Sequence, residues 1–150
     1  MKMVFLLMRW GSARCAADDR WFIGSCGLHV AQTVQTVSFI SYLFHEMQQY
    51  GPFLVIVPLS TITAWQTQFQ AWAPDMNVIT YIGTATAREV IRTYEFGLSH
   101  KKLRMNVLLT TYELTLRDAK ELGDIKWQLL AVDEVCRSIS LLTVWIDSLH

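Results

Sequence analysis

The chain has 150 residues, of which 52% are hydrophobic and 17% are charged, and its formal net charge is zero. This composition is that of one folded domain with a core, and it excludes a chain too charged and too poor in apolar residues to fold. A net charge of zero also excludes a protein drawn to nucleic acid by its overall charge. Any such binding has to come from a local surface.

The cysteines and the apolar runs exclude further classes of protein. The 3 cysteines, Cys15, Cys26 and Cys136, are far apart and odd in number. This argues against a zinc site or a disulfide framework and favours a reduced intracellular compartment. The apolar run near the start, MVFLLM, is shorter than the roughly 7–15 residues of a secretory signal. No run approaches the ~20 residues that span a bilayer, so we expect no membrane partner.

The first part of the chain has no clear period, and within it residues 21–23 are a weak candidate strand. From Thr33 onward the pattern sharpens, because apolar residues recur over about four turns and predict a largely buried helix ended by Gly51 and Pro52. Residues 53–57 form a continuous apolar run, which is typical of a strand covered on both faces. The steps of three and four between Ile62, Trp65, Phe69 and Trp72 then predict an amphipathic helix, which Pro74 stops.

Further strands and helices alternate along the rest of the chain. Thr86 and Glu89 have the spacing of a capping box, which predicts a helix from there to about residue 96. The basic segment around His100 to Arg104 is interpreted as a solvated connection. The other predicted strands are 77–82, 106–111 and 127–132, and the other predicted helices are 113–122 and the tail beyond Arg137.

This alternation predicts a parallel α/β sheet with helices on both faces. In such sheets the functional crevice lies at the carboxyl ends of the strands. Three polar segments directly follow predicted strands: PLST at 58–61, TTYE at 110–113, and the pair at 133–134. The fold therefore predicts that all three lie along one edge of the sheet.

Asp133 and Glu134 follow the apolar strand LLAV, as in a Walker B motif. There the aspartate holds Mg²⁺, usually through water, and the glutamate orients or deprotonates the attacking water. The alternative is two solvated acids at the end of a strand. The pair alone does not separate these interpretations.

The segment before Thr33 has part of the pattern of a phosphate-binding loop. Thr33 is in the position of the hydroxyl that contacts Mg²⁺, but His29 and Ala31 are in positions that require glycine. A Cβ at a positive φ costs about 1 kcal/mol or more. Gln32 is where such a loop has a lysine, and it carries no charge. The alternative is an ordinary loop that leads into a helix.

Three tryptophans lie in the periodic part of the chain. Trp65, Trp72 and Trp127 are interpreted as core anchors rather than as platforms for base stacking. Cys136 is interpreted as a small buried hydrophobe rather than as a nucleophile.

These motifs and the runs around them, YGPFLVIVPLSTITAWQTQFQAWAPDMNVITYIGTATAREVIRTYEF and MNVLLTTYELTLRDAKELGDIKWQLLAVDE, resemble a known family. They are similar to the first motor lobe of chromodomain-helicase-DNA-binding chromatin remodellers, which are Swi/Snf-type ATPases of helicase superfamily 2. The resemblance implies a RecA-like parallel sheet sandwiched by helices, here incomplete. It divides the chain into an unmatched segment 1–26, a partial ATP-binding lobe 27–137 and a divergent tail 138–150.

The same resemblance implies a cofactor, partners and site residues. ATP and Mg²⁺ are the cofactors of the family, DNA and the nucleosome are its partners, and the nucleus is its compartment. The family's phosphate loop corresponds to residues 26–33, where only the final threonine is kept, and its D-E-A-H box keeps both carboxylates. The implied catalytic residue is Glu134, the degraded phosphate loop is Ala31, Gln32 and Thr33, and the Mg²⁺ ligands are Asp133 and Thr33. The implied DNA contacts are Ser60, Thr61, Thr110, Thr111 and Tyr112.

In the family ATP lies between two lobes, and the second lobe supplies an arginine finger. The sequence matches the first lobe, and loss of such an arginine typically costs about 10³–10⁵ in rate. With Gln32 in place of the lysine as well, we expect a fragment of a DNA translocase that does not hydrolyse ATP alone. The alternative is a non-catalytic protein- or DNA-binding module, or a gene-remnant product without activity.

Overall fold

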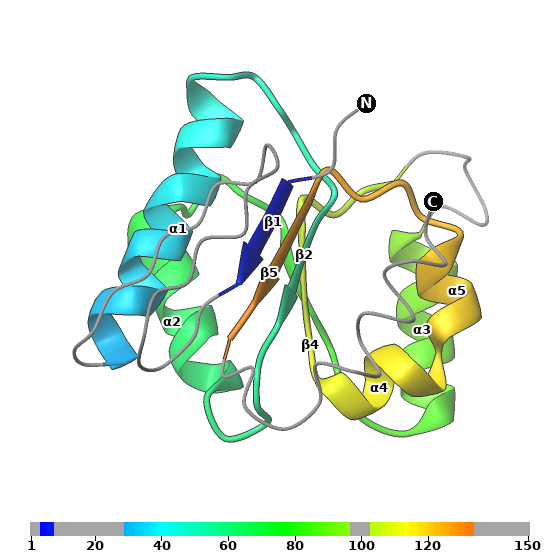
Figure 1. Ribbon diagram of the computed structural model, residues 1–150. Helices are drawn as coiled ribbons and strands as arrows, with labels where there is room; N and C mark the ends of the chain where they lie inside the picture. Colours follow the sequence, from blue (N-terminus) through cyan, green and yellow to red (C-terminus); the bar gives the residue numbers. More distant parts are fainter. Residues whose placement is uncertain (1–3, 8–28, 97–102, 134–150) are drawn as a thin grey trace.

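The computed structural model describes the backbone of residues 4–7, 29–96 and 103–133, with side chains from Thr33 onward. A sheet lies between two layers of helices (Figure 1). The predicted strand at 21–23, the tail helix beyond Arg137, the three cysteines and most of the basic segment at 100–104 lie outside the described residues.

Strands and helices alternate as the sequence predicts. The strands are β1 (Val4–Leu7), β2 (Phe53–Ile56), β3 (Val78–Tyr81), β4 (Val107–Thr110) and β5 (Leu129–Val132). The helices are α1 (His29–His45), α2 (Ile62–Trp72), α3 (Ala85–Glu95), α4 (Tyr112–Arg117) and α5 (Ala119–Gly123). The predicted parallel α/β class is therefore confirmed.

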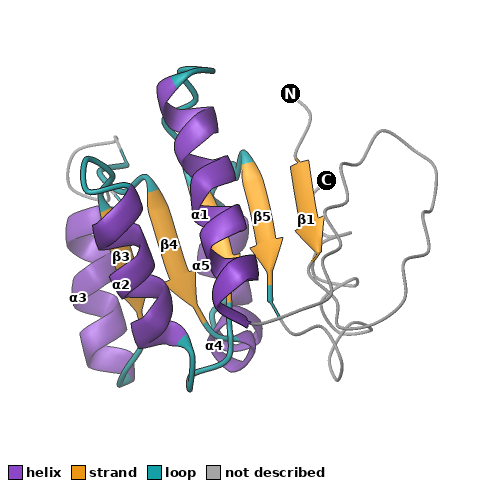
Figure 2. Cartoon of the chain, turned by 90° about the vertical axis from the view of Figure 1, so that its left-hand side faces the viewer, coloured by secondary structure: helices purple, strands orange, loops and turns teal. Residues whose placement is uncertain are grey.

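The sheet has five strands in the order β1-β5-β2-β4-β3, and every pair is parallel. The register aligns the carboxyl ends of the strands, because Val132 is opposite Leu7 and Ile56, and Thr110 is opposite Ile56 and Tyr81. Figure 2 shows β1 as the outer strand beside β5, with β3 at the other end. The residues that follow β2, β4 and β5 consequently come out along one edge, which we call the carboxyl edge.

Alternate side chains of the central strands enter two separate cores. Phe53 and Val55 of β2 pack with α1 and α2, whereas Leu54 and Ile56 of the same strand pack on the other side with residues of α3 and α5. Since α1 and α2 cover one face of the sheet and α3, α4 and α5 the other (Figure 1), both sets are removed from water. All four residues are 0% exposed.

Two helix starts and one helix break differ from the prediction. Helix α1 begins at His29 rather than Thr33. Helix α3 is capped by Thr84 rather than Thr86, because the Thr84 side chain accepts a hydrogen bond from the Ala87 amide. The single helix predicted at 113–122 is instead two short helices that meet at Asp118.

Burial of the aromatic side chains confirms part of the prediction. Trp65 and Trp127 are core residues, 1% and 4% exposed, but Trp72 is 58% exposed and donates its indole N–H to Gln68 on the same helix. The expectation that Trp72 anchors the core was therefore wrong. Helix α1 is also less buried than its composition suggests, since Tyr42 is 52% exposed.

Strand β1 was not predicted. Its residues, Val4–Leu7, had no predicted secondary structure, and they pair with β5. This strand covers the edge of β5 that faces away from β2. The backbone N–H and C=O groups on that edge of β5 are therefore not exposed as an unpaired sheet edge.

We expect Gly51→Ala to destabilise the protein more than Gly83→Ala. The φ angles are +91° at Gly51 and +105° at Gly83, so each substitution costs about 1–2 kcal/mol in backbone strain. At Gly51 the added Cβ would also lie 2.5 Å from the backbone oxygen of Asn106, whereas at Gly83 it would meet the Ala87 Cβ at 3.5 Å. Urea unfolding of the two variants measures the difference. Equal losses would contradict the steric argument.

Candidate functional site

The carboxyl edge brings together the three polar segments that the sequence placed after strands. The Asp133 amide donates to the Ile56 carbonyl at 2.9 Å, and the Val57 amide donates to the Thr110 carbonyl at 2.9 Å. The chain thus stays attached to the sheet for one residue past β5 and past β2. The segments that follow start from a fixed backbone.

Asp133 turns its side chain toward the layer of α1 and α2. It continues the alternation of β5, in which Leu129 and Ala131 face that layer. Its carboxylate oxygen Oδ2 accepts a hydrogen bond from the indole Nε1 of Trp65, on α2, at 3.3 Å. Asp133 is 7% exposed and Trp65 is 1% exposed, so the bond is formed away from bulk water.

The backbone of Asp133 is bonded from the opposite layer. The Tyr112 hydroxyl, at the start of α4, donates to the Asp133 carbonyl oxygen at 3.0 Å. Tyr112 packs against the core on the α3 to α5 side of the sheet. Asp133 is therefore bonded to α2 on one face and to α4 on the other, and both of these helices follow predicted DNA-contact segments.

The PLST segment forms a tight turn between β2 and α2. Both the amide and the hydroxyl of Thr61 donate to the Pro58 carbonyl at 3.1 Å. This leaves Leu59 and Ser60 exposed at the top of the turn, and Leu59 is 65% exposed. Ser60 is thus the polar side chain of this segment that faces outward, while the Thr61 hydroxyl takes part in holding the turn.

The TTYE segment is divided between the interior and the surface. Thr110 is 0% exposed, and its hydroxyl donates to the Tyr81 carbonyl at 3.1 Å. Thr111 and Tyr112 are partly exposed, and Thr111 precedes α4 without a capping bond from its side chain. A contact from this segment to DNA would have to come from Thr111 and Tyr112, because the Thr110 side chain is enclosed.

The residues assigned to the phosphate loop lie on α1. Ala31 and Gln32 are in its first turn, and Thr33 follows with 8% of its surface exposed. Figure 1 shows this turn at the end of the sheet where the strands finish. Among the described residues the non-glycine with positive φ is Gln48, so Ala31 is not strained. Glu134, the predicted catalytic residue, lies outside the described residues.

The oxygen donors at this edge suit Mg²⁺ rather than a softer metal. In the described part of the chain no group of three or more His, Cys, Asp or Glu residues is placed to hold a metal ion. A carboxylate such as Asp133 with a hydroxyl such as Thr33 matches Mg²⁺, which uses one or two protein oxygens together with water and substrate phosphates.

None of the described helices is both long and apolar enough to cross a membrane.

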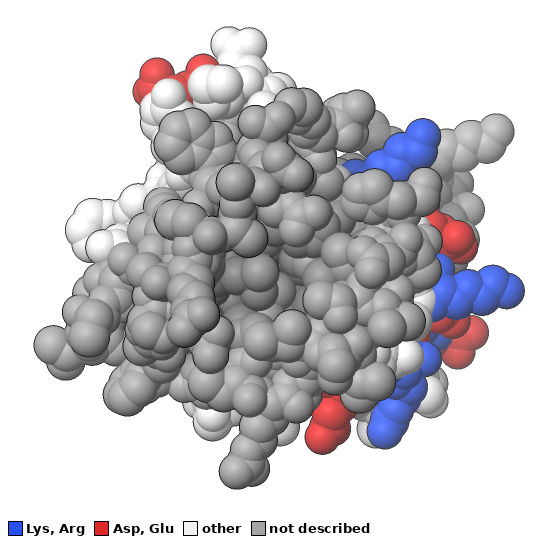
Figure 3. Space-filling view, viewed as in Figure 1, with Lys and Arg blue, Asp and Glu red and all other residues white. Residues whose placement is uncertain are grey.

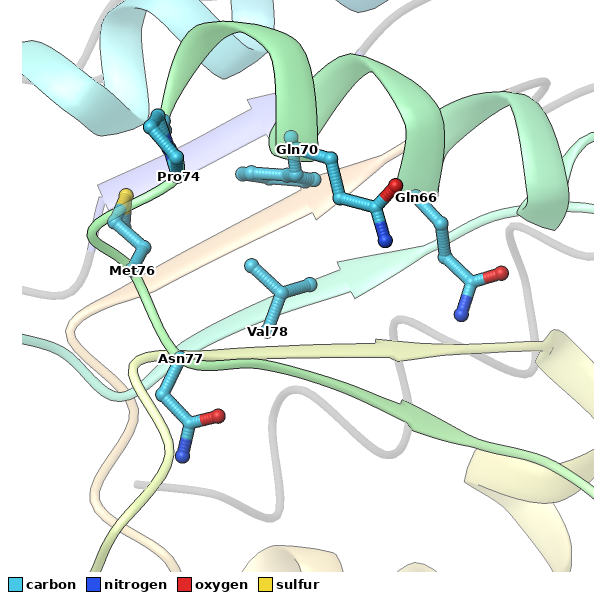
Figure 4. Close-up of a pocket in the computed structure, with 8 residues that line it drawn as sticks. Gln66, Gln70, Pro74, Met76, Asn77 and Val78 are labelled. Carbon is cyan, nitrogen blue, oxygen red and sulfur yellow. The ribbon is translucent and has the colours of Figure 1, made fainter.

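One cavity of the described residues lies away from this edge. It has a volume of about 290 Å³ and is bordered by the end of α2 and the amino end of β3. Figure 4 shows Gln66 and Gln70 on the helix, Met76 and Asn77 on the connection, and Val78 at the start of the strand. Since Asn77 precedes β3, the cavity is at the opposite end of that strand from the carboxyl edge.

A second polar cluster, which the sequence did not reveal, is buried beneath α3. The Asp118 carboxylate accepts hydrogen bonds from Arg88 Nε and from the Tyr81 hydroxyl, both at 2.6 Å, and Arg92 lies 3.4 Å from it. The Arg88 and Asp118 side chains are 4% and 9% exposed. This cluster ties α3 and β3 to Asp118, the junction of α4 and α5, where the predicted single helix is broken.

The cluster shifts the pKa values of its members. Burial raises the pKa of Tyr81 to about 12, with a further contribution from its bond to Asp118. Burial alone would raise the pKa of Asp118, but the hydrogen bonds from Arg88 and Tyr81 outweigh it and hold the pKa below 3.8. Asp118 thus stabilises the fold above pH 3.8, whereas the contribution of Tyr81 is complete below pH 10.0 and declines toward pH 12.

The charged side chains are unevenly distributed over the two layers. Helices α1 and α2 contain no Lys, Arg, Asp or Glu. Figure 3 shows described charges of both signs along the side where Figure 1 places α3, α4 and α5. The mixture of signs gives this side no uniform positive potential, so attraction to DNA phosphates would have to come from local donors.

The fold and the edge define a class: a RecA-like α/β lobe with a buried aspartate and two polar segments at the carboxyl edge of its sheet. A family model described as the SNF2-related domain matches residues 27–138. The chain belongs to the SNF2-related family.

Similar proteins agree with this assignment. Chromodomain-helicase-DNA-binding protein 1 of Gallus gallus is 51% identical over 109 residues, which is 72% of this chain and 6% of that protein. Protein CHROMATIN REMODELING 5 of Arabidopsis thaliana is 47% identical over 111 residues, again 72% of this chain and 6% of the relative. The chain thus spans a small part of these relatives.

A solved structure has the same fold. The Sulfolobus solfataricus SWI2/SNF2 ATPase core in complex with dsDNA matches with a TM-score of 0.60 and 26% identity. The match covers 79% of this chain and 22% of that one. The RecA-like parallel sheet with helices on both faces is therefore confirmed.

Asp118→Asn is expected to lower the free energy of unfolding by about 3–5 kcal/mol at neutral pH, because it leaves the Arg88 guanidinium buried without its carboxylate. The exposed Asp124→Asn should change it by less than about 0.5 kcal/mol. The difference in the free energy of unfolding between Asp118→Asn and the unmodified chain should become smaller as the pH falls below 3.8. Protonation of the Asp118 carboxylate then removes the charge that the substitution removes. Urea unfolding over a pH series measures this, and a constant gap would contradict it.

Proposed function

We propose that this chain is part of the first, ATP-binding lobe of a chromatin-remodelling DNA translocase that acts in the nucleus. The observation that carries the proposal is the bonding of Asp133 to α2 and α4 at the carboxyl edge. The family assignment supports the same class. Movement of DNA on nucleosomes would be an activity of a whole remodeller, in which this chain supplies one part of the motor.

In this function Asp133 and Thr33 would hold Mg²⁺ together with the ATP phosphates, and Glu134 would orient the attacking water. Mg²⁺ would neutralise the charge that develops on the transferred phosphoryl group. The first turn of α1 presents backbone N–H groups at the end of the sheet where the phosphates would lie. Gln32 adds a neutral hydrogen-bond donor where a lysine charge is needed, so we infer weak phosphate binding and no useful hydrolysis by this chain alone.

DNA would lie across the exposed parts of the PLST and TTYE segments. Ser60 is exposed at the top of its turn, Thr61 is partly exposed, and Thr111 and Tyr112 are partly exposed on the neighbouring segment. Hydroxyl groups of this kind donate to phosphate oxygens and fix position without reading sequence. The solved relative in complex with dsDNA supports this class of partner.

A second candidate function is that of a non-catalytic binding module. The observation that favours it is that Ala31 and Gln32 continue a helix rather than a glycine-rich loop. Such a module would keep contacts to DNA or protein without using ATP. Nucleotide binding separates the two candidates.

Mg·ATP at millimolar concentration is expected to raise the melting temperature of the unmodified chain little and that of Gln32→Lys clearly. The added ammonium contacts the phosphates, and ligand binding to the native state stabilises it by mass action. Gln35→Lys, which adds the same charge at an exposed position of α1, is the matched control and should behave as the unmodified chain. If Mg·ATP raises the melting temperature of the unmodified chain equally, the inference of weak phosphate binding is wrong. If it does not raise the melting temperature of Gln32→Lys, the non-catalytic module is favoured.

Ser60→Glu is expected to weaken binding to a short DNA duplex, because the new carboxylate faces the phosphates. Ser38→Glu makes the same change at an exposed position of α1, and it should leave binding unchanged. The difference should be largest at low salt, where charges are screened least. Fluorescence anisotropy over a salt series measures it. Equal effects at both positions would place the DNA elsewhere.

A further inference from the structure

We propose that Trp65 is the positioning residue of the Asp133 carboxylate and that it links this carboxylate to the DNA-facing turn at Ser60 and Thr61. The inference rests on the proposed function, since it assigns the metal to Asp133 and DNA to the turn. It adds a residue and a physical connection between the two sites.

Trp65 is bonded to both sites. Its backbone amide donates to the Thr61 carbonyl at 3.1 Å, in the first turn of α2. Its indole Nε1 donates to Asp133 Oδ2 at 3.3 Å, across 68 residues of sequence. One residue therefore joins the end of the PLST turn to the end of β5, and a displacement of Thr61 is passed to the partner of the carboxylate.

The indole is well suited to this task. It is a donor that cannot accept, so it favours the ionised carboxylate oxygen over a protonated one. The ring is 1% exposed and lies 6.4 Å from the ring of Phe69 between centroids, so packing restricts its movement. An ordered ring holds the carboxylate in one orientation, and this orientation decides where a metal ion can sit.

Asp133 is also connected to the second DNA-facing segment. The Tyr112 hydroxyl bonds to its carbonyl oxygen at 3.0 Å, and Tyr112 directly follows Thr111. Two bonds from two DNA-facing segments thus meet on one aspartate. Occupancy of DNA and of the metal site should affect each other, because coupling between two sites is reciprocal.

The alternative role of Trp65 is packing alone, and other tryptophans of the chain serve as matched controls. Trp127 is 4% exposed and donates its indole N–H to the Leu122 carbonyl at 2.7 Å, so it is buried and bonded but belongs to the other core. Trp72 is on the same helix as Trp65 but is 58% exposed. A response of the Trp65 indole that Trp127 does not share is not explained by burial. A response that Trp72 does not share is not explained by a position on α2.

The first experiment follows the indole N–H resonances of the full chain by nitrogen-15 NMR, with each signal assigned from its Trp→Phe variant. Asp133→Asn is expected to shift the Trp65 signal and leave those of Trp127 and Trp72 in place. In unfolding, Trp65→Phe and Asp133→Asn should each raise the unfolding equilibrium constant about tenfold, and the double variant should raise it by less than the product. Trp127→Phe and Asp133→Asn together should raise the unfolding equilibrium constant by the product of their separate effects. A Trp65 signal that ignores Asp133→Asn would overturn the proposal.

The second experiment adds a short DNA duplex to the same sample, or Mg²⁺ with ATP to the Gln32→Lys variant, in which the proposed function expects phosphate binding to be strengthened. Either addition is expected to shift the Trp65 indole signal while Trp127 and Trp72 stay unchanged. If the backbone amides of Ser60 and Thr61 respond to DNA but the Trp65 indole does not, the link is wrong and the DNA site stands. If no signal responds to either addition, the proposed function fails and the link fails with it.

Discussion

The structure depends on the burial of the central strands on both faces. Every residue of β2, β4 and β5 is buried, and these strands lie next to one another in parallel. A sheet with two apolar faces needs a layer of helices on each, and parallel strands need a crossover between them, so α1 and α2 cover one face and α3, α4 and α5 the other. The carboxyl edge is a consequence, since parallel strands in register end together.

The same alternation decides what the edge presents. Even-numbered residues of β5 pack beneath α3 to α5 and odd-numbered ones beneath α1 and α2, so Asp133 directs its carboxylate toward α2. Its buried position is tolerable because a charged acceptor in a low-dielectric region gains from a fixed donor. Tyr112 meets the same residue from the other layer, at its backbone. The aspartate is therefore one point, among the described residues, at which the two helix layers are joined by hydrogen bonds.

Much of the fold was predictable because local pattern and tertiary environment agree. The bounds of α2 follow from its periodicity and from Pro74, and β2, β4 and β5 follow from continuous apolar runs. Other features depend on contacts distant in sequence. Asp118, where the helix breaks, is paired with Arg88, 30 residues away, and the Asp133 carboxylate is bonded to Trp65, 68 residues away. Neither pairing leaves a local signal in the sequence, although a buried indole N–H such as that of Trp65 usually has a hydrogen-bond partner.

The segment before Thr33 shows how structure can change the reason for an expected defect. The sequence suggested that Ala31 would be strained, because a phosphate loop needs glycine at positive φ. In the structure Ala31 is helical, a conformation in which alanine is the most favourable residue. The backbone is therefore not strained by the absence of glycine. The free amide groups at the start of the helix still lie at the end of the sheet where the strands finish. Two features then separate this segment from a phosphate site: the helix that is present in place of a glycine-rich loop, and the charge that Gln32 does not carry. A change of one side chain addresses the missing charge more directly than rebuilding a loop, since glycines placed in this turn would cost about 1 kcal/mol each in helix propensity.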